Sequence, residues 1–561
     1  MPEDDRVELI VKYHGDLPTI AGTLGAEAEL LFQGYAIITI DRNRIPELYS
    51  FPQIENIELP KLLSFEQSNT LVTTCVKNVQ SSPLWDLRGQ GVLVAVIDSG
   101  LDYQHPDFRN EDGTSRVRYV WDQTATSGHP PKGFVSGAEY DKTELDAALA
   151  SSDPLRMVPF VDTNGHGTAV AGIAAGNGRA RPGSALGVAP EADIISVKLG
   201  TRGYESFART TELMRAIKYV IDKARLLEEP VAINISVGMN NGSHRGDSLF
   251  ESFLDASSAE WKNVIVIPTG NEGGAAHHFE GTVATGETKE IDFFVAGGIP
   301  RFFVTLWKDF ADTFSVELIL PNGRSSGLIN VDNQVKVFRD DNLEVKILYG
   351  QPNHYSLAQQ ISFDVEAIPG TTISSGLWKI MIQGHDIVNG QFDAWLPTLE
   401  AVSNQTFFAS PSSVNTLTIP STANKVISVA GYSDRTDSVL DFSGKGPVNT
   451  PFRNPDLAAP ASNILAPSVG GNYDSFTGTS FAAPFVTGAA ALMMQWGIVR
   501  KNDPFLYGQR VKAFLRLGAK RSPNRTYPNI SWGYGTLCLE RSMEFLKKYK
   551  LGGGKEFWTS M

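Results

Sequence analysis

Apolar residues recur along the chain in two patterns that predict two kinds of sheet. Residues 92–97, 231–235 and 263–268 are short, largely apolar runs, which is typical of parallel strands buried on both faces. Between about residues 279 and 404, several stretches instead alternate apolar and polar positions, which favours antiparallel strands with one solvated face. The pattern therefore predicts an α/β core with a parallel sheet and a separate antiparallel β unit.

The antiparallel unit contains about eight predicted strands separated by turn signals, and this spacing indicates a β-sandwich or jelly roll. Asn322-Gly323 and Asn389-Gly390 are the dipeptides that favour tight hairpin turns. The core pattern resumes from residue 405, so residues 279–404 are predicted to be an insertion within the core.

The first 66 residues have a pattern of their own, which predicts a small α+β unit ahead of the core. Strands are expected over residues 7–15, 34–42 and 54–59, and helices over residues 19–32 and 43–51. The predicted organisation has four segments: an N-terminal unit over 1–66, a first core part over 67–278, the insertion over 279–404, and a second core part over 405–561.

The longest apolar helix is predicted over residues 481–499, directly after Ser480. It is apolar nearly all round, which indicates a helix buried on every side. Its polar residues, Thr487 and Gln495, favour a core helix over a membrane span. The start of a helix carries unpaired N–H groups and partial positive charge, so an anion formed near Ser480 would be stabilised there.

Residues that can carry chemistry follow the ends of the apolar runs. Asp98 ends the run 92–97, and Asn271 follows the run 263–268. Because functional groups of parallel α/β sheets gather at the carboxyl ends of the strands, we expect both side chains at one edge of the sheet. His166 stands between two glycines, which allow other backbone to approach its imidazole closely.

Three segments, "VIDSG" at Asp98, "NGHGTAVAG" at His166 and "GTSFAAP" at Ser480, occur in this order. Together they resemble the motifs of the subtilisin-like serine proteases, the subtilases, and other triad folds use different orders. The resemblance implies a subtilisin-like core in which Ser480 is the nucleophile and His166 its general base. It further implies that Asp98 orients the imidazole and that Asn271 donates to the oxyanion of the intermediate.

The same resemblance implies where a peptide substrate would bind. It assigns substrate contacts to the strand segment Ser236, Val237 and Gly238 and to Gly270. Glycine at these positions would leave room for a substrate side chain. Glu272 is expected near the rim of that pocket, where its charge would disfavour acidic substrate residues.

The N-terminal α+β unit resembles a subtilase prodomain, which packs on the protease and is cut from it by the enzyme itself. The bond between Gln67 and Ser68 is the expected cleavage site. A prodomain, an intact triad and an inserted β-sandwich together resemble the Csp-type germination proteases of clostridial spore formers. That resemblance implies limited proteolysis of a protein precursor, such as the precursor of a spore cortex-lytic enzyme.

Two alternatives stay open at this point. Some relatives of this architecture have lost triad residues and act as scaffolds or sensors, and a retained prodomain can silence an intact triad. The insertion is either a module that binds a protein or carbohydrate partner or a brace for the core. Reactivity of Ser480 separates the enzyme from the scaffold.

A metal centre is the weaker interpretation of the polar residues. Asp98, Asp102, His105 and His166 have metal-ligand chemistry, but the chain has no HExxH helix and no CxxC pair. Many subtilases bind structural calcium, and the corresponding loop here carries Arg179 and Arg181 where oxygen ligands would be needed. No cofactor or catalytic metal is therefore expected, and structural calcium stays an open alternative that this loop does not support.

Composition narrows the partners and the compartment. The 561 residues carry a formal net charge of −13, which makes nucleic acid an improbable partner. Only Cys75 and Cys538 occur, so a disulfide framework is excluded but one bridge is not. The N-terminal residues lack a basic segment followed by an apolar run, so we expect a cytoplasmic or spore-associated protein without a membrane anchor.

Overall fold

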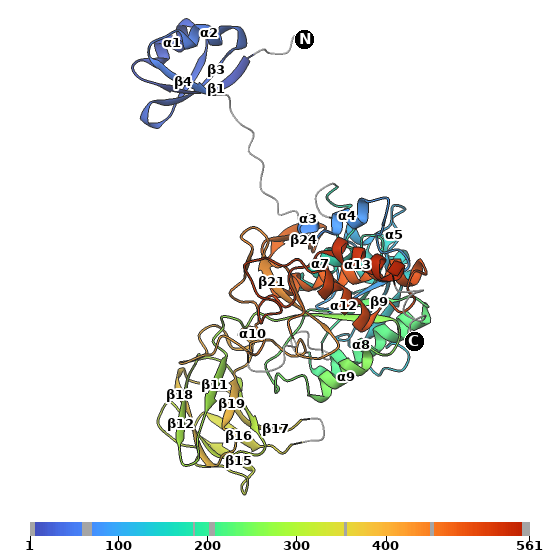
Figure 1. Cartoon of the computed structure of the whole chain (residues 1–561), viewed down its shortest axis with the longest axis vertical. Coiled ribbons are helices and arrows are strands. Elements are labelled where there is room, and N and C mark those ends of the chain that lie inside the picture. Colours follow the sequence, from blue (N-terminus) through green and yellow to red (C-terminus); the bar gives the residue numbers. More distant parts are fainter. Residues whose placement is uncertain are drawn as a thin grey trace. The chain divides into compact units, whose positions relative to one another are not determined.

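The computed structural model describes residues 6–58, 70–182, 186–200, 208–352, 356–448 and 454–552 (Figure 1). Its contacts divide the chain into two compact units, Met1–Gln67 and Ser68–Met561. Each unit is described by itself.

The N-terminal unit is a four-stranded antiparallel sheet with the order β2-β3-β1-β4, covered by two short helices. Its elements are β1 (Arg6–Tyr13), α1 (Leu17–Thr23), β2 (Glu27–Leu30), β3 (Tyr35–Asp41), α2 (Ile45–Tyr49) and β4 (Ile54–Glu58). Alternate residues of β1 and β3, including Leu9, Val11 and Ile38, are fully or almost fully buried under the helices. The predicted α+β unit is confirmed.

One predicted helix in this unit is wrong. The expected helix over residues 19–32 stops at Thr23, and Glu27–Leu30 forms the edge strand β2, paired with β3. Gly25 adopts a positive φ of 63°, which ends the helical path at low cost because glycine has no Cβ. Pairing with β3 then decides the conformation of the short segment that follows.

The second unit is built on a mostly parallel sheet with the strand order β22-β21-β10-β9-β5-β8-β6-β7, and β23 also pairs with β21. The strands that pair in parallel are β5 (Leu93–Asp98), β6 (Val117–Asp122), β8 (Asp193–Lys198), β9 (Val231–Ile235), β10 (Asn263–Pro268), β21 (Ile427–Ser433) and β23 (Leu457–Pro460). The antiparallel strands β7 (Ala138–Asp141) and β22 (Ser438–Val439) pair at the two ends of this order. Every residue of β5, β9 and β10 is buried, as the unbroken apolar runs predict.

Helices cover both faces of this sheet, so the unit has one hydrophobic core on each face. Val92, Val94 and Val96 pack with α7 (His166–Ala175) and α11 (Ala483–Met494). The alternate residues of β5 pack with α8 (Thr210–Leu226) and α9 (Leu249–Ser257) on the opposite face. The remaining helices of this unit are α3 (Thr70–Thr73), α4 (Val76–Ser81), α5 (Lys142–Ala150), α6 (Pro154–Met157), α10 (Leu399–Val402), α12 (Gly508–Gly518) and α13 (Leu539–Gly552).

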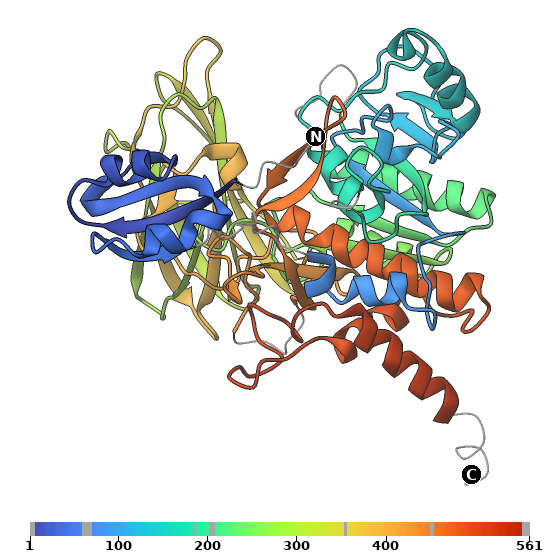
Figure 2. The same cartoon turned by 90° about the horizontal axis from the view of Figure 1, so that it is seen from above.

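The helical stretch Thr479–Val499 is long and apolar enough to cross a membrane, yet 83% of its most apolar window is buried inside the protein. All residues of α11 are buried, as predicted for a core helix. A disulfide joins Cys75, next to α4, to Cys538, next to α13. In Figure 2 the short helix α4, drawn in a lighter blue than the N-terminal unit, lies beside the red helix α13. The disulfide joins the two helices at these ends.

The insertion forms two antiparallel sheets with one shared core. The orders are β11-β19-β13-β17-β16-β15 and β14-β18-β12-β20. The strands are β11 (His278–Thr282), β12 (Thr288–Val295), β13 (Arg301–Asp309), β14 (Thr313–Ile319), β15 (Val335–Arg339), β16 (Leu343–Tyr349), β17 (Ala358–Ala367), β18 (Gly376–Asp386), β19 (Gln391–Trp395) and β20 (Phe407–Phe408). Buried aromatic residues of both sheets, such as Phe293, Phe314 and Phe363, meet between them.

This arrangement confirms the predicted α/β core with an inserted antiparallel unit. The last strand of the second sheet, Phe407–Phe408, comes a few residues after the predicted end of the insertion. A separate hairpin of the core, β24 (Ile464–Ser468) and β25 (Asn472–Phe476), precedes Ser480.

Candidate active site

Asp98 is the last residue of β5, and its carboxylate is buried with 3% of the residue exposed. Its Oδ1 accepts hydrogen bonds from the Ser99 N–H and from His166 Nδ1, both at 2.7 Å. Its Oδ2 is buried without a hydrogen-bond partner in the described part of the chain. The strand end therefore presents a desolvated carboxylate whose main partner is the imidazole.

His166 is the first residue of α7, and a glycine on each side permits this position. Gly165 has a φ of +80°, and a Cβ at Gly167 would lie 2.2 Å from the Gly100 carbonyl oxygen. The helix therefore meets the loop after β5 more closely than any side chain would allow. Backbone does approach closely beside His166, as glycine predicts, although the contact shown is to Gly167 rather than to the imidazole.

Asp162 supports this arrangement, although the sequence analysis assigned it no role. Its Oδ1 accepts the Gly165 N–H at 3.0 Å and the Ser99 hydroxyl at 2.8 Å. Its Oδ2 accepts the N–H and the hydroxyl of Thr168 at 2.8 and 2.7 Å. A carboxylate at the start of a helix satisfies its unpaired N–H groups, and here it also fixes the first turn that carries His166.

The environment of His166 raises its pKa. Burial of the imidazole acts to lower the pKa, but the charge of Asp98, the hydrogen bond to Asp98 and the charge of Asp162 together outweigh it. The protonated imidazole is therefore stabilised relative to an imidazole in water.

Ser480 lies in a tight helical turn, Thr479–Phe481, just before α11. Gly478 has a φ of +150°, a conformation that essentially only glycine adopts, and it turns the chain into this position. The Ser236 hydroxyl donates to the Ser480 carbonyl oxygen at 3.1 Å and accepts from Asn234 Nδ2 at 2.7 Å. The serine is thus held through its backbone carbonyl, and the residue lines the cavity described next.

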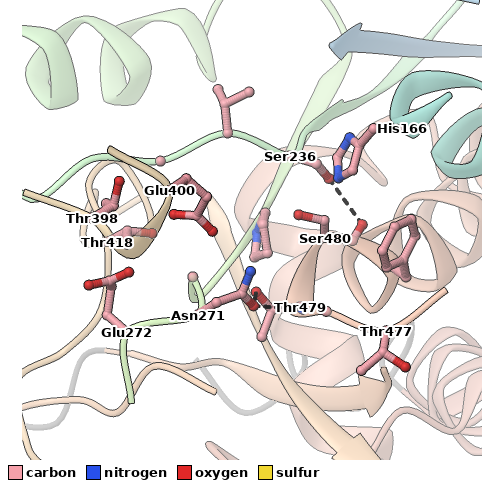
Figure 3. A pocket seen from close by; sticks show the side chains of 16 residues that line it. His166, Ser236, Asn271, Glu272, Thr398, Glu400, Thr418, Thr477, Thr479 and Ser480 are labelled. Atoms are coloured by element: carbon pink, nitrogen blue, oxygen red, sulfur yellow. Dashed lines mark hydrogen bonds between the residues drawn. The ribbon is translucent and has the colours of Figure 1, made fainter. Parts of the chain in front are cut away.

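Figure 3 shows the cavity of about 390 Å³ in which these residues meet. His166, Ser480 and Asn271 all line it, and the His166 ring lies 5.2 Å from the Phe481 ring. The predicted substrate-contacting residues Ser236, Val237, Gly238 and Gly270 also line this cavity.

The amide of Asn271 has a defined orientation. Its Oδ1 accepts hydrogen bonds from the Thr479 N–H at 3.1 Å and the Thr479 hydroxyl at 3.0 Å. Because a backbone N–H can only donate, the atom facing it must be the amide oxygen. The Nδ2 hydrogens are therefore left to donate to a group beside Ser480.

Glu272 lines the cavity, as expected, but its carboxylate is held by neighbouring polar groups. It is buried, with 3% exposed, and its Oε1 accepts the Leu399 N–H at 3.0 Å. Its Oε2 pairs with His277 Nδ1 at 2.7 Å and accepts from Asn240 Nδ2 at 3.2 Å. These three polar partners hold the carboxylate in place, and whether its charge disfavours acidic substrate residues stays a prediction.

The cavity is completed by Thr398, Glu400 and Thr418, none of which was predicted. Thr398 and Glu400 come from the segment that returns from the insertion, and Thr418 precedes β21. No local motif marks them, because they reach the cavity only once the insertion has folded.

The candidate metal ligands do not converge. Asp102 accepts N–H groups of Gln104 and Gly470, at 3.1 and 2.9 Å. His105 Nδ1 accepts the Asp107 N–H, and its Nε2 faces the Asn472 carbonyl at 3.1 Å. Among the described residues no group of three or more His, Cys, Asp or Glu side chains could hold a metal ion.

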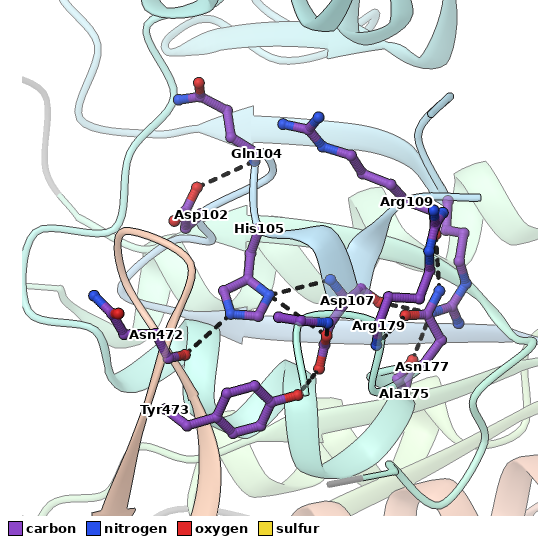
Figure 4. A network of polar contacts seen from close by, with 12 residues as sticks. Asp102, Gln104, His105, Asp107, Arg109, Ala175, Asn177, Arg179, Asn472 and Tyr473 are labelled. Carbon is purple, nitrogen blue, oxygen red and sulfur yellow. Dashed lines mark hydrogen bonds and ion pairs between the residues drawn. The ribbon is translucent and has the colours of Figure 1, made fainter. Parts of the chain in front are cut away.

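Figure 4 shows how the polar groups of this region satisfy one another. The Asp107 carboxylate accepts the Ala180 N–H at 2.9 Å and the Tyr473 hydroxyl. Ala180 belongs to the loop in which a structural calcium was considered, and Tyr473 lies on β25. The expected cleavage site at Gln67 and Ser68 lies outside the described residues.

Comparison with known proteins agrees with this geometry. A model described as the subtilase family matches residues 89–301 and 398–535, and a model described as the Csp protease B prodomain matches residues 1–61. The solved structure of the Clostridium perfringens CspB protease is 36% identical, with a TM-score of 0.78, and covers 86% of this chain and 98% of that chain.

Two curated relatives are more distant. The PII-type proteinase of Lactococcus lactis subsp. cremoris is 24% identical over 515 residues, which are 82% of this chain and 25% of that protein. The minor extracellular protease Vpr of Bacillus subtilis is 21% identical over 550 residues, which are 93% of this chain and 62% of that protein. The chain thus spans about a quarter of the length of the lactococcal relative.

Proposed function

Because the chain belongs to the subtilase family, we propose that it is a serine endopeptidase whose nucleophile is Ser480. The observation that carries this proposal is the hydrogen-bonded Asp98–His166 pair, whose imidazole lines one cavity with Ser480 and Asn271. A buried acid, a histidine and a serine beside a free amide donor are the parts that acyl transfer requires.

In this mechanism His166 Nε2 takes the proton from Ser480 Oγ as the hydroxyl attacks the substrate carbonyl. Asp98 accepts from Nδ1–H, so it keeps the tautomer whose Nε2 is unprotonated and then stabilises the imidazolium. His166 returns the proton to the leaving amine, and water repeats the sequence on the acyl-enzyme.

The negative oxygen of the tetrahedral intermediate needs donors that are already in place. Asn271 Nδ2 is one, because Thr479 occupies the other end of its amide. The Ser480 N–H at the start of the buried helix is the second, and the partial positive charge of that helix end favours the same oxygen.

The first substrate we propose is the chain itself, cut after the N-terminal unit between Gln67 and Ser68. The match of residues 1–61 to a Csp protease B prodomain supports an inhibitory or chaperone role for that unit. The later substrate is a protein precursor that is activated by limited proteolysis. The likeness to the clostridial CspB protease favours a spore-associated role, with a cortex-lytic enzyme precursor as the candidate.

We further propose that this activity needs no calcium at the loop around Ala180. The Asp107 oxygens already accept from Ala180 and Tyr473, so this carboxylate has its hydrogen-bond partners without an ion. The sign of the nearby Arg116 and Arg179 side chains also opposes a cation there.

The intact mass of the purified full chain tests the proposal. Wild type is expected as two fragments divided between residues 60 and 80, whereas a Ser480→Ala variant stays whole. Ser475→Ala, an exposed serine on β25, is the matched control and is expected to process like wild type. A fluorophosphonate label on Ser480 then reports the nucleophile directly.

Both fragments appearing in the Ser480→Ala sample would assign the cut to a contaminating protease. If wild type stays whole and Ser480 is not labelled, the chain is a silent scaffold and the endopeptidase proposal is overturned. If Ser480 is labelled but the chain stays whole, the proposed self-cleavage is wrong and the endopeptidase proposal stands.

A further inference from the structure

The cavity beside Ser480 has a second end, formed by residues outside the catalytic motifs. Thr398 and Glu400 close one side of it, and Thr418 lies between two glycines of its walls. In Figure 3 the Glu400 carboxylate lies with the Thr398 and Thr418 hydroxyls, on the opposite side of Asn271 from Thr477. A substrate side chain that enters from Ser480 would therefore end among these three groups.

Thr418 sets the depth of this pocket. A Cβ at Gly238 would lie 2.5 Å from Thr418 Oγ1, and a Cβ at Gly270 would lie 2.4 Å from the same atom. The Thr418 side chain thus fills the space between the two backbone walls. Within the described residues its hydroxyl makes one long contact, of 3.4 Å to the Thr269 carbonyl oxygen, so its lone pairs remain available to a donor.

The charge of the pocket comes from one residue. The lining contains no Lys or Arg among the described residues, and its only carboxylates are Glu272 and Glu400. Glu272 is buried and its oxygens accept from Leu399, His277 and Asn240. Glu400 is exposed and forms no hydrogen bond or ion pair within the part of the chain that the structure describes.

A hydrogen bond to Glu272 holds the turn that carries Glu400. Glu272 Oε1 accepts the N–H of Leu399, the residue before Glu400 and the first of α10. Thr398 lies at the N-cap of α10 but makes no side-chain capping bond, so its hydroxyl is left to the cavity. The buried carboxylate next to Asn271 therefore anchors the turn that presents Glu400.

We propose that Glu400 is the specificity-determining residue of this pocket, and that it selects a substrate side chain ending in N–H donors. The side chain concerned belongs to the residue whose carbonyl Ser480 attacks, called P1 here. Lysine, arginine and glutamine can donate to Glu400 and to the two threonine hydroxyls, whereas glutamate would place a second carboxylate against Glu400. This assignment rests on the proposed endopeptidase function.

The test measures kcat/KM of the full chain on four peptides that differ only at P1, which is lysine, glutamine, leucine or glutamate. Wild type is expected to prefer lysine and glutamine to leucine and to cleave the glutamate peptide slowest. Glu400→Gln is expected to lower kcat/KM for the lysine peptide about tenfold, because a charge-assisted hydrogen bond becomes a neutral one. The same variant should raise the glutamate peptide about tenfold and leave the leucine peptide within twofold.

Glu280→Gln is the matched control, since it removes the same charge from an exposed residue that lines a different cavity. Its ratio of lysine to glutamate cleavage should equal that of wild type. If Glu400→Gln leaves this ratio unchanged while the peptides are still cleaved, the specificity assignment is overturned and the endopeptidase proposal stands. If no peptide is cleaved and Ser480 takes no fluorophosphonate, the endopeptidase proposal fails and this assignment fails with it.

Discussion

Two histidines of this protein, the partly exposed His166 and the buried His277, pair with a carboxylate through Nδ1, yet only His166 can take part in chemistry. His166 Nδ1 lies 2.7 Å from Asp98 Oδ1, and His277 Nδ1 lies 2.7 Å from Glu272 Oε2. They differ at the second ring nitrogen. His277 Nε2 lies 2.8 Å from the Thr406 carbonyl oxygen, whereas His166 lines the cavity that holds Ser480.

The difference shows what a His–carboxylate pair needs before it can act as a base. The side chains of His277 and Glu272 are 1% and 3% exposed, and both ring nitrogens of His277 face acceptors. It joins the core to the start of the insertion and holds α10 through Glu272. A histidine enclosed on both sides stabilises a junction, and one with an open nitrogen can exchange a proton with a substrate or a nucleophile.

The largest expected contrast comes from removing each imidazole. His166→Ala is expected to lower kcat about 10⁴-fold or more with little change in thermal stability, because the base of the reaction is lost. His277→Ala leaves Glu272 buried without its main partner, and breaking a buried pair typically costs about 3–5 kcal/mol. Its kcat, measured well below the unfolding temperature, should stay within about tenfold of wild type.

Peptide hydrolysis and calorimetry on both variants measure this contrast. The comparison is wrong if His277→Ala lowers kcat as far as His166→Ala while its unfolding temperature matches wild type.

Neighbouring residues give the next contrast. Asn271→Ala is expected to lower kcat by about 10²–10³ with KM nearly unchanged, because its amide donor acts on the transition state. Glu272→Gln keeps the shape of the adjacent side chain and removes the charge that pairs with His277. Its main effect should be a lower unfolding temperature, so steady-state kinetics and calorimetry would distinguish the two positions.

The pH dependence of the reaction tests the role of His166 as the general base. Because the pKa of His166 is raised, kcat/KM should fall about tenfold per pH unit below a midpoint that lies above the ordinary value of about 6.5. Asp98→Asn removes the charge that opposes the burial of the imidazole, so the midpoint should move to lower pH as the rate falls. A midpoint that stays in place would assign the acid limb to another group.

The predictable part of the site consists of residues whose local sequence carries the geometry. Asp98 and Asn271 follow buried strands, and glycines flank His166, so short segments place these side chains. The parallel core and the antiparallel insertion were predictable for the same reason, because burial on both faces and on one face leaves different patterns.

The anchoring contacts of Glu272 and the position of Glu400 could not be predicted in this way. Their roles depend on segments far apart in the sequence, since the Leu399 N–H donates to the Glu272 carboxylate and the segment that returns from the insertion carries Glu400. The helix expected over residues 19–32 failed on the same principle, because β3 competes for residues 27–30 through pairing that no local pattern records.

The smallest effect concerns another buried histidine, His105, whose two nitrogens are also occupied. It lies in the network where Tyr473 donates to Asp107, and the hydroxyl joins the β24–β25 hairpin to the core. Tyr473→Phe removes that donor and should cost about 1–3 kcal/mol of stability, because a buried carboxylate oxygen loses its partner. The kcat at 25 °C should be unchanged, since this network does not line the cavity of Ser480. Calorimetry with and without EDTA completes the test: EDTA should leave wild type unchanged, and a drop equal to that of Tyr473→Phe would instead show that an ion holds Asp107.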